Sequence, residues 1–148
     1  MFLEYFDQME AWADAAVKSL KASGYKQLYQ QSIDAGYMVH GEYNYHNILF
    51  DATSEKDNYG HRKLNVYTVN FDHFKKNVQV EDLYYFLRKA MEKQGFKEWI
   101  SDGILNAYSA IIPLGKNELE YLKNRLMYPE KFFKLQIHII IQIKHGYQ

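Results

Sequence analysis

The 148-residue chain balances 18 basic residues against 18 acidic ones and contains no cysteine. The balanced charge disfavours nucleic acid as a partner, because strong binding usually needs a broad positive field. Without cysteine the chain has no disulfide, thiol nucleophile or thiolate metal site. The length suits a single domain over residues 1–148.

The aromatic content is high, with 14 Tyr, 9 Phe and 2 Trp. Tyrosine combines a large apolar ring with a polar hydroxyl, so it serves both in cores and at protein interfaces. Composition alone leaves both uses open.

The N-terminal part of the chain predicts two helices. Apolar residues recur at helical spacing over Phe2–Ser23, and Gly24 is a suitable stop. A second, shorter helix is predicted over Tyr25–Ile33.

The next part of the chain predicts a β-hairpin. Alternation over Tyr37–Asp51 indicates one long strand, and its apolar parity switches at Asn47, which favours a bulge or bend. Residues Ala52–Arg62 have loop composition, and Lys63–Phe71 resumes as a strand. We expect these strands to pair antiparallel around a long tip.

The C-terminal half predicts two helices and two strands. The helices are Val80–Gln94, with Glu81 and Asp82 in its first turn, and Asn117–Tyr128. The strands are Ile104–Ile112 and Phe132–His145.

The last of these strands has the clearest pattern in the chain. Its apolar parity runs from Leu135 to Ile143. Apart from Ile140, polar residues occupy the other parity: Gln136, His138, Gln142 and Lys144. An unpaired apolar strand of this kind is prone to aggregation, so we expect it to be paired on both sides. Its polar face is then a candidate contact surface.

The element order is therefore α-(α)-β-β-α-β-α-β. Right-handed crossovers would place the helices mainly on one face of the sheet. The sequence predicts an α+β fold, a two-layer α/β sandwich with about four strands in one mixed sheet and three to four helices.

No catalytic motif is present: Gly-x-Ser-x-Gly, the phosphate-binding Gly-x-x-x-x-Gly-Lys-Ser/Thr and His-Glu-x-x-His are all absent. Six histidines invite a metal hypothesis, and His40, Glu42 and His46 share one strand parity. Their spacing matches no metal motif, and histidines on a polar sheet face explain the pattern as well. We therefore expect no enzyme activity, metal or cofactor.

Aromatic residues next to basic ones, as in Tyr59-Gly-His61-Arg62-Lys63, could stack the bases of a single-stranded nucleic acid. Each such segment has too few basic residues to form a stripe, so this binding stays a third hypothesis.

The acidic N-terminus and the lack of a long apolar run predict no signal peptide and no membrane span. We expect the host-cell cytoplasm or a virion as the location.

Charge is distributed unevenly along the chain. Residues 1–17 carry four acids and no bases, a charge of −4, whereas residues 116–148 carry six bases and three acids, a charge of +3. Ends of opposite sign could let copies meet head to tail, as in rings or filaments.

The cysteine-free, Tyr/Lys/Asn-rich small α/β layout loosely resembles the small ring-forming proteins at phage head–tail junctions, a likeness of composition that rests on no motif. The leading hypothesis is a non-enzymatic structural protein of phage or mobile-element origin, a homo-oligomer or part of a larger protein assembly. Its interface candidates, besides the polar face of the last strand, are Tyr43, Tyr45, His46 and Tyr59. The alternative is a small protein-binding inhibitor, such as an anti-defence or immunity protein.

Overall fold

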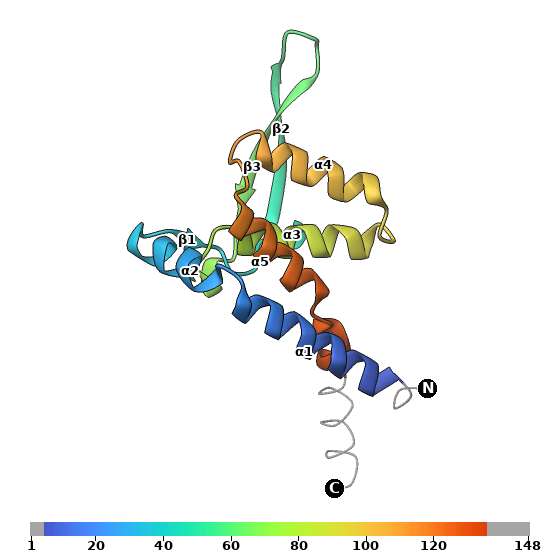
Figure 1. Cartoon of the computed structure of the whole chain (residues 1–148). Coiled ribbons are helices and arrows are strands. Elements are labelled where there is room, and N and C mark those ends of the chain that lie inside the picture. The colour runs from blue at the N-terminus through green and yellow to red at the C-terminus, as the bar shows by residue number, and fades with distance from the viewer. Residues whose placement is uncertain (1–4, 136–148) are drawn as a thin grey trace, which may run out of the picture. The chain divides into compact units, whose positions relative to one another are not determined.

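A computed structural model describes residues 5–135, which form a mixed α+β structure (Figure 1). Those residues contain five assigned α-helices and two small antiparallel sheets of two strands each. The chain divides into two compact units, Met1–Lys26 with Lys116–Gln148, and Gln27–Gly115. We describe each unit separately, and the single domain stays a prediction.

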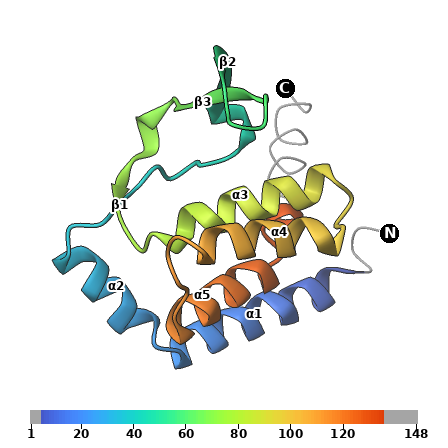
Figure 2. The ribbon, with the colours of Figure 1, turned by 90° about the horizontal axis from the view of Figure 1, so that it is seen from above.

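The first unit is built on two helices that lie side by side, α1 (Phe6–Ala22) and α5 (Lys116–Met127) (Figures 1 and 2). Ala13 and Ala16 are buried on α1, and small side chains allow two helices to approach closely. Tyr121 of α5 stacks on Tyr25, with ring centroids 5.4 Å apart. Both predicted helices are confirmed over the described residues.

The chain turns after α1 at Ser23 and Gly24. The Ser23 hydroxyl accepts a hydrogen bond from the Tyr25 amide at 3.2 Å and donates one to the Leu20 carbonyl at 2.7 Å. A Cβ at Gly24 would overlap the Asn117 side-chain amide, so glycine here lets that side chain approach the turn closely. Helix α2 (Tyr25–Asp34) then follows, as predicted.

The second unit has its core on α3 (Val80–Lys93). Val80, Leu83, Tyr84 and Leu87 are buried along one face of this helix, at the spacing seen in the sequence. Beside its first turn, β1 (Met38–Val39) pairs antiparallel with β4 (Lys75–Lys76). Val39 and Val78 are buried as well.

The longer sheet is a hairpin of β2 (Ile48–Lys56) and β3 (Arg62–Thr68). Its register pairs Ile48 with Thr68, and an irregularity follows Ala52. The predicted antiparallel hairpin is confirmed, but β2 extends to Lys56 and shortens the tip. At the tip, the Asp57 carboxylate accepts hydrogen bonds from the amides of Tyr59 and His61, at 2.9 and 2.8 Å.

Several features of the predicted sheet differ from the structure. Residues 37–51 form no single strand, because the chain leaves β1 after Val39, passes a turn at Gly41 (φ 83°) and starts β2 at Ile48. The predicted strand Ile104–Ile112 is wrong, since it overlaps helix α4 (Glu98–Ser109). Ile104, Ala107 and Ile111 recur three and four residues apart, which is the helical period, so the spacing itself favoured a helix over a strand.

The predicted strand Phe132–His145 is wrong at its start, because residues 130–135 are helical, and Phe132 lies 6.5 Å from Phe6 of α1 between ring centroids. The rest of that strand lies outside the described residues. Within residues 5–135 the strands form two separate sheets rather than one mixed sheet. Those residues do not confirm the two-layer sandwich, and the strand order differs from the prediction.

Candidate functional site

One face of the β2–β3 hairpin is apolar and open to solvent. The register places Phe50 opposite Val66 and Ala52 opposite Leu64, so the four side chains share one face. Phe50 is 66% exposed, Leu64 59% and Val66 58%. We call these four residues the hairpin face.

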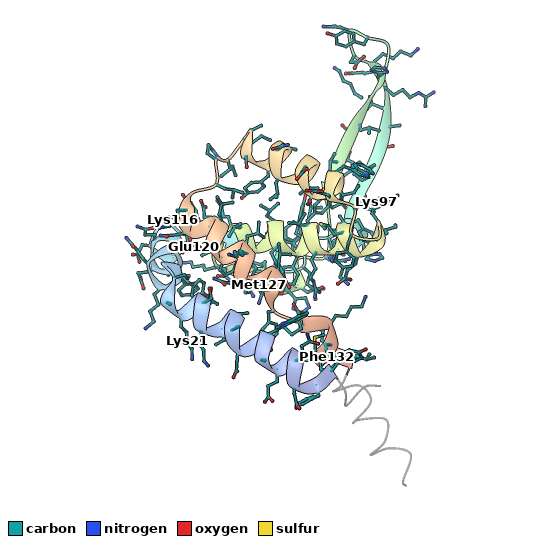
Figure 3. The ribbon with its side chains drawn as sticks, turned by 45° about the vertical axis from the view of Figure 1, so that its right-hand side comes forward. Lys21, Lys97, Lys116, Glu120, Met127 and Phe132 are labelled. Atoms are coloured by element: carbon teal, nitrogen blue, oxygen red, sulfur yellow. The ribbon has the colours of Figure 1, made fainter. Side chains whose placement is uncertain are left out.

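The hairpin has little cover of its own. On its other face, Leu49 and Tyr67 are paired and also exposed, next to Asp51 and Asn65. Among the described residues, no further strand pairs with β2 or β3. Figure 3 shows the outer part of the hairpin extending beyond the helices of its unit, with side chains projecting from the strands. A lone two-stranded hairpin is marginally stable in water. Uncovered apolar side chains on such a hairpin therefore mark a candidate interaction surface.

The base of the hairpin is fixed by buried polar groups. Asn47 accepts a hydrogen bond from the Asn70 amide group at 2.8 Å, and its own Nδ2 donates to the Glu42 carbonyl at 2.9 Å. The His40 ring is buried, and both of its nitrogens form hydrogen bonds. Nε2 bonds to the Val69 carbonyl at 2.8 Å, and Nδ1 accepts from the Glu42 amide at 3.2 Å. Nδ1 therefore accepts a hydrogen bond and Nε2 is placed to donate one.

The two acids at the start of α3 are structural acceptors. The Asp82 carboxylate accepts hydrogen bonds from the amides of His40 at 2.7 Å and Gly41 at 3.0 Å. Glu81 is buried and pairs with Lys75 at 3.1 Å and with the side chain of Asn77. Both carboxylates thus connect α3 to the chain around β1 and β4. This role is additional to the favourable interaction with the helix dipole that the sequence predicted.

A groove lies between α3 and α4. It consists of two adjoining cavities of about 440 and 430 Å³, which share Phe86, Gly103 and Ile104 in their walls. Lys93 and Tyr45 bound the first cavity, and the Lys93 ammonium lies 4.3 Å from the centre of the Tyr45 ring. None of the residues of α4 is buried, although the helix is largely apolar. Much of the lining of this groove is therefore accessible.

The predicted interface residues fall in different places. Tyr43 and Tyr45 line the groove, and His46 is exposed with its ring 4.2 Å from that of Tyr45. Tyr59 is 87% exposed at the hairpin tip, so the structure does not bring all four together. Gln136, His138, Gln142 and Lys144 lie outside the described residues.

The sequence reasoning missed the hairpin face. Its signal was present, because Phe50 and Ala52 share a parity in one strand and Leu64 and Val66 share one in the other. The loop composition of Ala52–Arg62 concealed the outer half of β2. The alternation of apolar and polar residues does not reveal that this face is exposed. The same alternation occurs in a sheet whose apolar face is covered.

Over residues 5–135, no three His, Asp or Glu side chains gather where they could hold a metal ion. Helices in the same part of the chain are too short or too polar to cross a membrane. Comparison with protein-family models, curated proteins and solved structures found no match.

Proposed function

We propose that the protein is a non-enzymatic assembly protein whose copies associate through the hairpin face. The observation that carries this proposal is the exposure of Phe50, Leu64 and Val66 on one face of a two-stranded sheet. Covering that face would remove apolar surface from water, which is favourable by roughly 25 cal/mol for each Å².

Charge favours a second copy as the occupant. The hairpin carries three acids and three bases on and around its outer half: Asp51, Glu55, Asp57, Lys56, Arg62 and Lys63. Lys63 pairs with Glu55 at 2.9 Å within the hairpin itself. The surface therefore has no net sign that would select a charged partner, and a chain of zero net charge does little to keep its copies apart.

The geometry also suits a two-fold contact. In such a contact the hairpin face of one copy packs against the hairpin face of the other. Two sheets packed face to face lie about 10 Å apart, and their side chains interdigitate. Phe50 and Val66 of one copy would pack against the same pair of the other. The phage-type ring or virion role predicted from composition is one setting for this contact and stays a prediction.

Substituting two adjacent residues of β3 tests the proposal. Val66→Lys places a charge on the hairpin face, whereas Asn65→Lys places the same charge on the opposite face of the same strand. Burying an unpaired charge is costly, so Val66→Lys should weaken dimerisation at least about tenfold, while Asn65→Lys changes it little. Sedimentation equilibrium over a wide concentration range measures both dissociation constants.

Two results would contradict self-association through this face. One is a wild-type protein that stays strictly monomeric at high concentration in low and moderate salt. The other is an equal loss of dimer in Val66→Lys and Asn65→Lys, which would place the contact elsewhere.

A monomer would favour the second hypothesis, a protein-binding inhibitor. The observation behind it is the α3–α4 groove, whose walls include Tyr43, Phe86 and Ile104. An apolar groove between helices suits the apolar stripe of a partner's helix. Loss of partner binding in Ile104→Asp, with Asn106→Asp on the exposed side of α4 as control, would support this hypothesis.

A further inference from the structure

We propose that the first unit holds a binding site for a small uncharged molecule with an apolar ring and a hydroxyl donor. The site is a cavity of about 250 Å³ between α1 and α5. These helices run side by side, and Lys21 marks α1 while Glu120 and Met127 mark α5 (Figure 3). The proposal is independent of the hairpin face.

The cavity has an apolar wall and a buried amide oxygen, Asn124 Oδ1, that needs a partner. Ala16, Val17 and Leu20 of α1 form the apolar wall. Asn124 of α5 also lines the cavity, is only 4% exposed, and its buried Oδ1 receives no hydrogen bond from any described residue. A buried amide oxygen is normally satisfied, so a donor inside the cavity would complete this site.

The lining residues decide which donor fits. Asn124 Oδ1 can only accept a hydrogen bond, so an ionised carboxylate would offer it no donor. Arg125 also lines the cavity, and its positive charge would repel an ammonium group. A neutral hydroxyl avoids both problems.

The size of the cavity suits a single ring. An engineered apolar cavity of about 150 Å³ accommodates benzene, so a cavity of about 250 Å³ has room for a ring with one substituent. Tyr128 completes the lining with a further aromatic surface. Phenol is therefore a suitable probe, and toluene is its counterpart without the donor.

Titration calorimetry of the full-length protein tests this site. We expect saturable one-to-one binding of phenol, about five- to tenfold weaker in Asn124→Leu, because one buried hydrogen bond is lost. Binding of toluene should change less than about twofold in the same variant. Asn106→Leu, an exposed asparagine of α4 in the other unit, should leave both affinities unchanged.

A second variant covers the case in which Asn124→Leu fails to fold. Val17 lines the cavity and is 38% exposed, and Val17→Trp should fill the cavity and abolish binding of both probes. The proposal is overturned by three results: no saturable phenol binding to the wild type, equal phenol affinity in Asn124→Leu, or tighter binding of the acceptor benzaldehyde than of phenol.

Discussion

The two sheets of the second unit differ in how their size relates to their burial. The β1–β4 sheet has two residues in each strand, yet Val39 is buried and Asp82 of α3 binds the chain directly after β1. The β2–β3 hairpin has nine and seven residues, but its apolar side chains beyond Ile48 lie open. The length of a ladder therefore does not decide how firmly a sheet is held, because burial and long-range hydrogen bonds contribute most of the stability.

The largest contrast should come from shortening one leucine in each region. Leu87 of α3 is 1% exposed, so Leu87→Ala should lower the free energy of unfolding by about 2–5 kcal/mol. Leu64→Ala on the hairpin face should change it by less than about 0.5 kcal/mol in dilute, monomeric protein. Urea unfolding followed by circular dichroism measures both, and equal losses would mean that the hairpin face is covered within the monomer.

A smaller contrast is expected from two aspartates. Asp82→Ala removes the acceptor of two backbone amides near β1, which should cost about 2–4 kcal/mol because these donors lose their partner. Asp51→Ala, at an exposed position of β2 opposite Asn65, should lie within about 0.5 kcal/mol of the wild type. The same urea titration applies, and a neutral Asp82→Ala would show that water can replace the carboxylate.

The finest comparison uses two glycines with nearly the same backbone angle. Gly41 has φ 83° and Gly60, at the hairpin tip, has φ 84°. An added Cβ at Gly60 meets no other atom within 4 Å, whereas at Gly41 it would overlap the carbonyl oxygen of His73. Gly60→Ala should therefore cost about 1 kcal/mol from backbone strain alone, and Gly41→Ala about 1–2 kcal/mol more.

Thermal unfolding of the two alanine variants, at the same protein concentration, measures that difference. Equal melting temperatures for Gly41→Ala and Gly60→Ala would indicate that the His73 carbonyl moves aside freely. In that case the turn after β1 is less tightly held than its hydrogen bonds to Asp82 imply.

The sequence by itself determined the elements whose signals are local. Helices α1, α2, α3 and α5 follow from apolar spacing and from stops such as Gly24, and the hairpin follows from alternation on both sides of a polar tip. These signals lie within one or two turns of helix or a few strand residues. Helix α4 was predicted as a strand although Ile104, Ala107 and Ile111 recur at helical spacing.

Only the tertiary structure decided which of these elements are covered. The carboxylate of Asp82 meets an amide 42 residues away, and Asn124 faces a cavity whose apolar wall belongs to α1. Phe50 and Val66 show the same alternation as a buried pair would, yet they lie open. Periodicity depends on neighbours along the chain, whereas burial depends on residues brought together from far apart, and the candidate sites of this protein depend on burial.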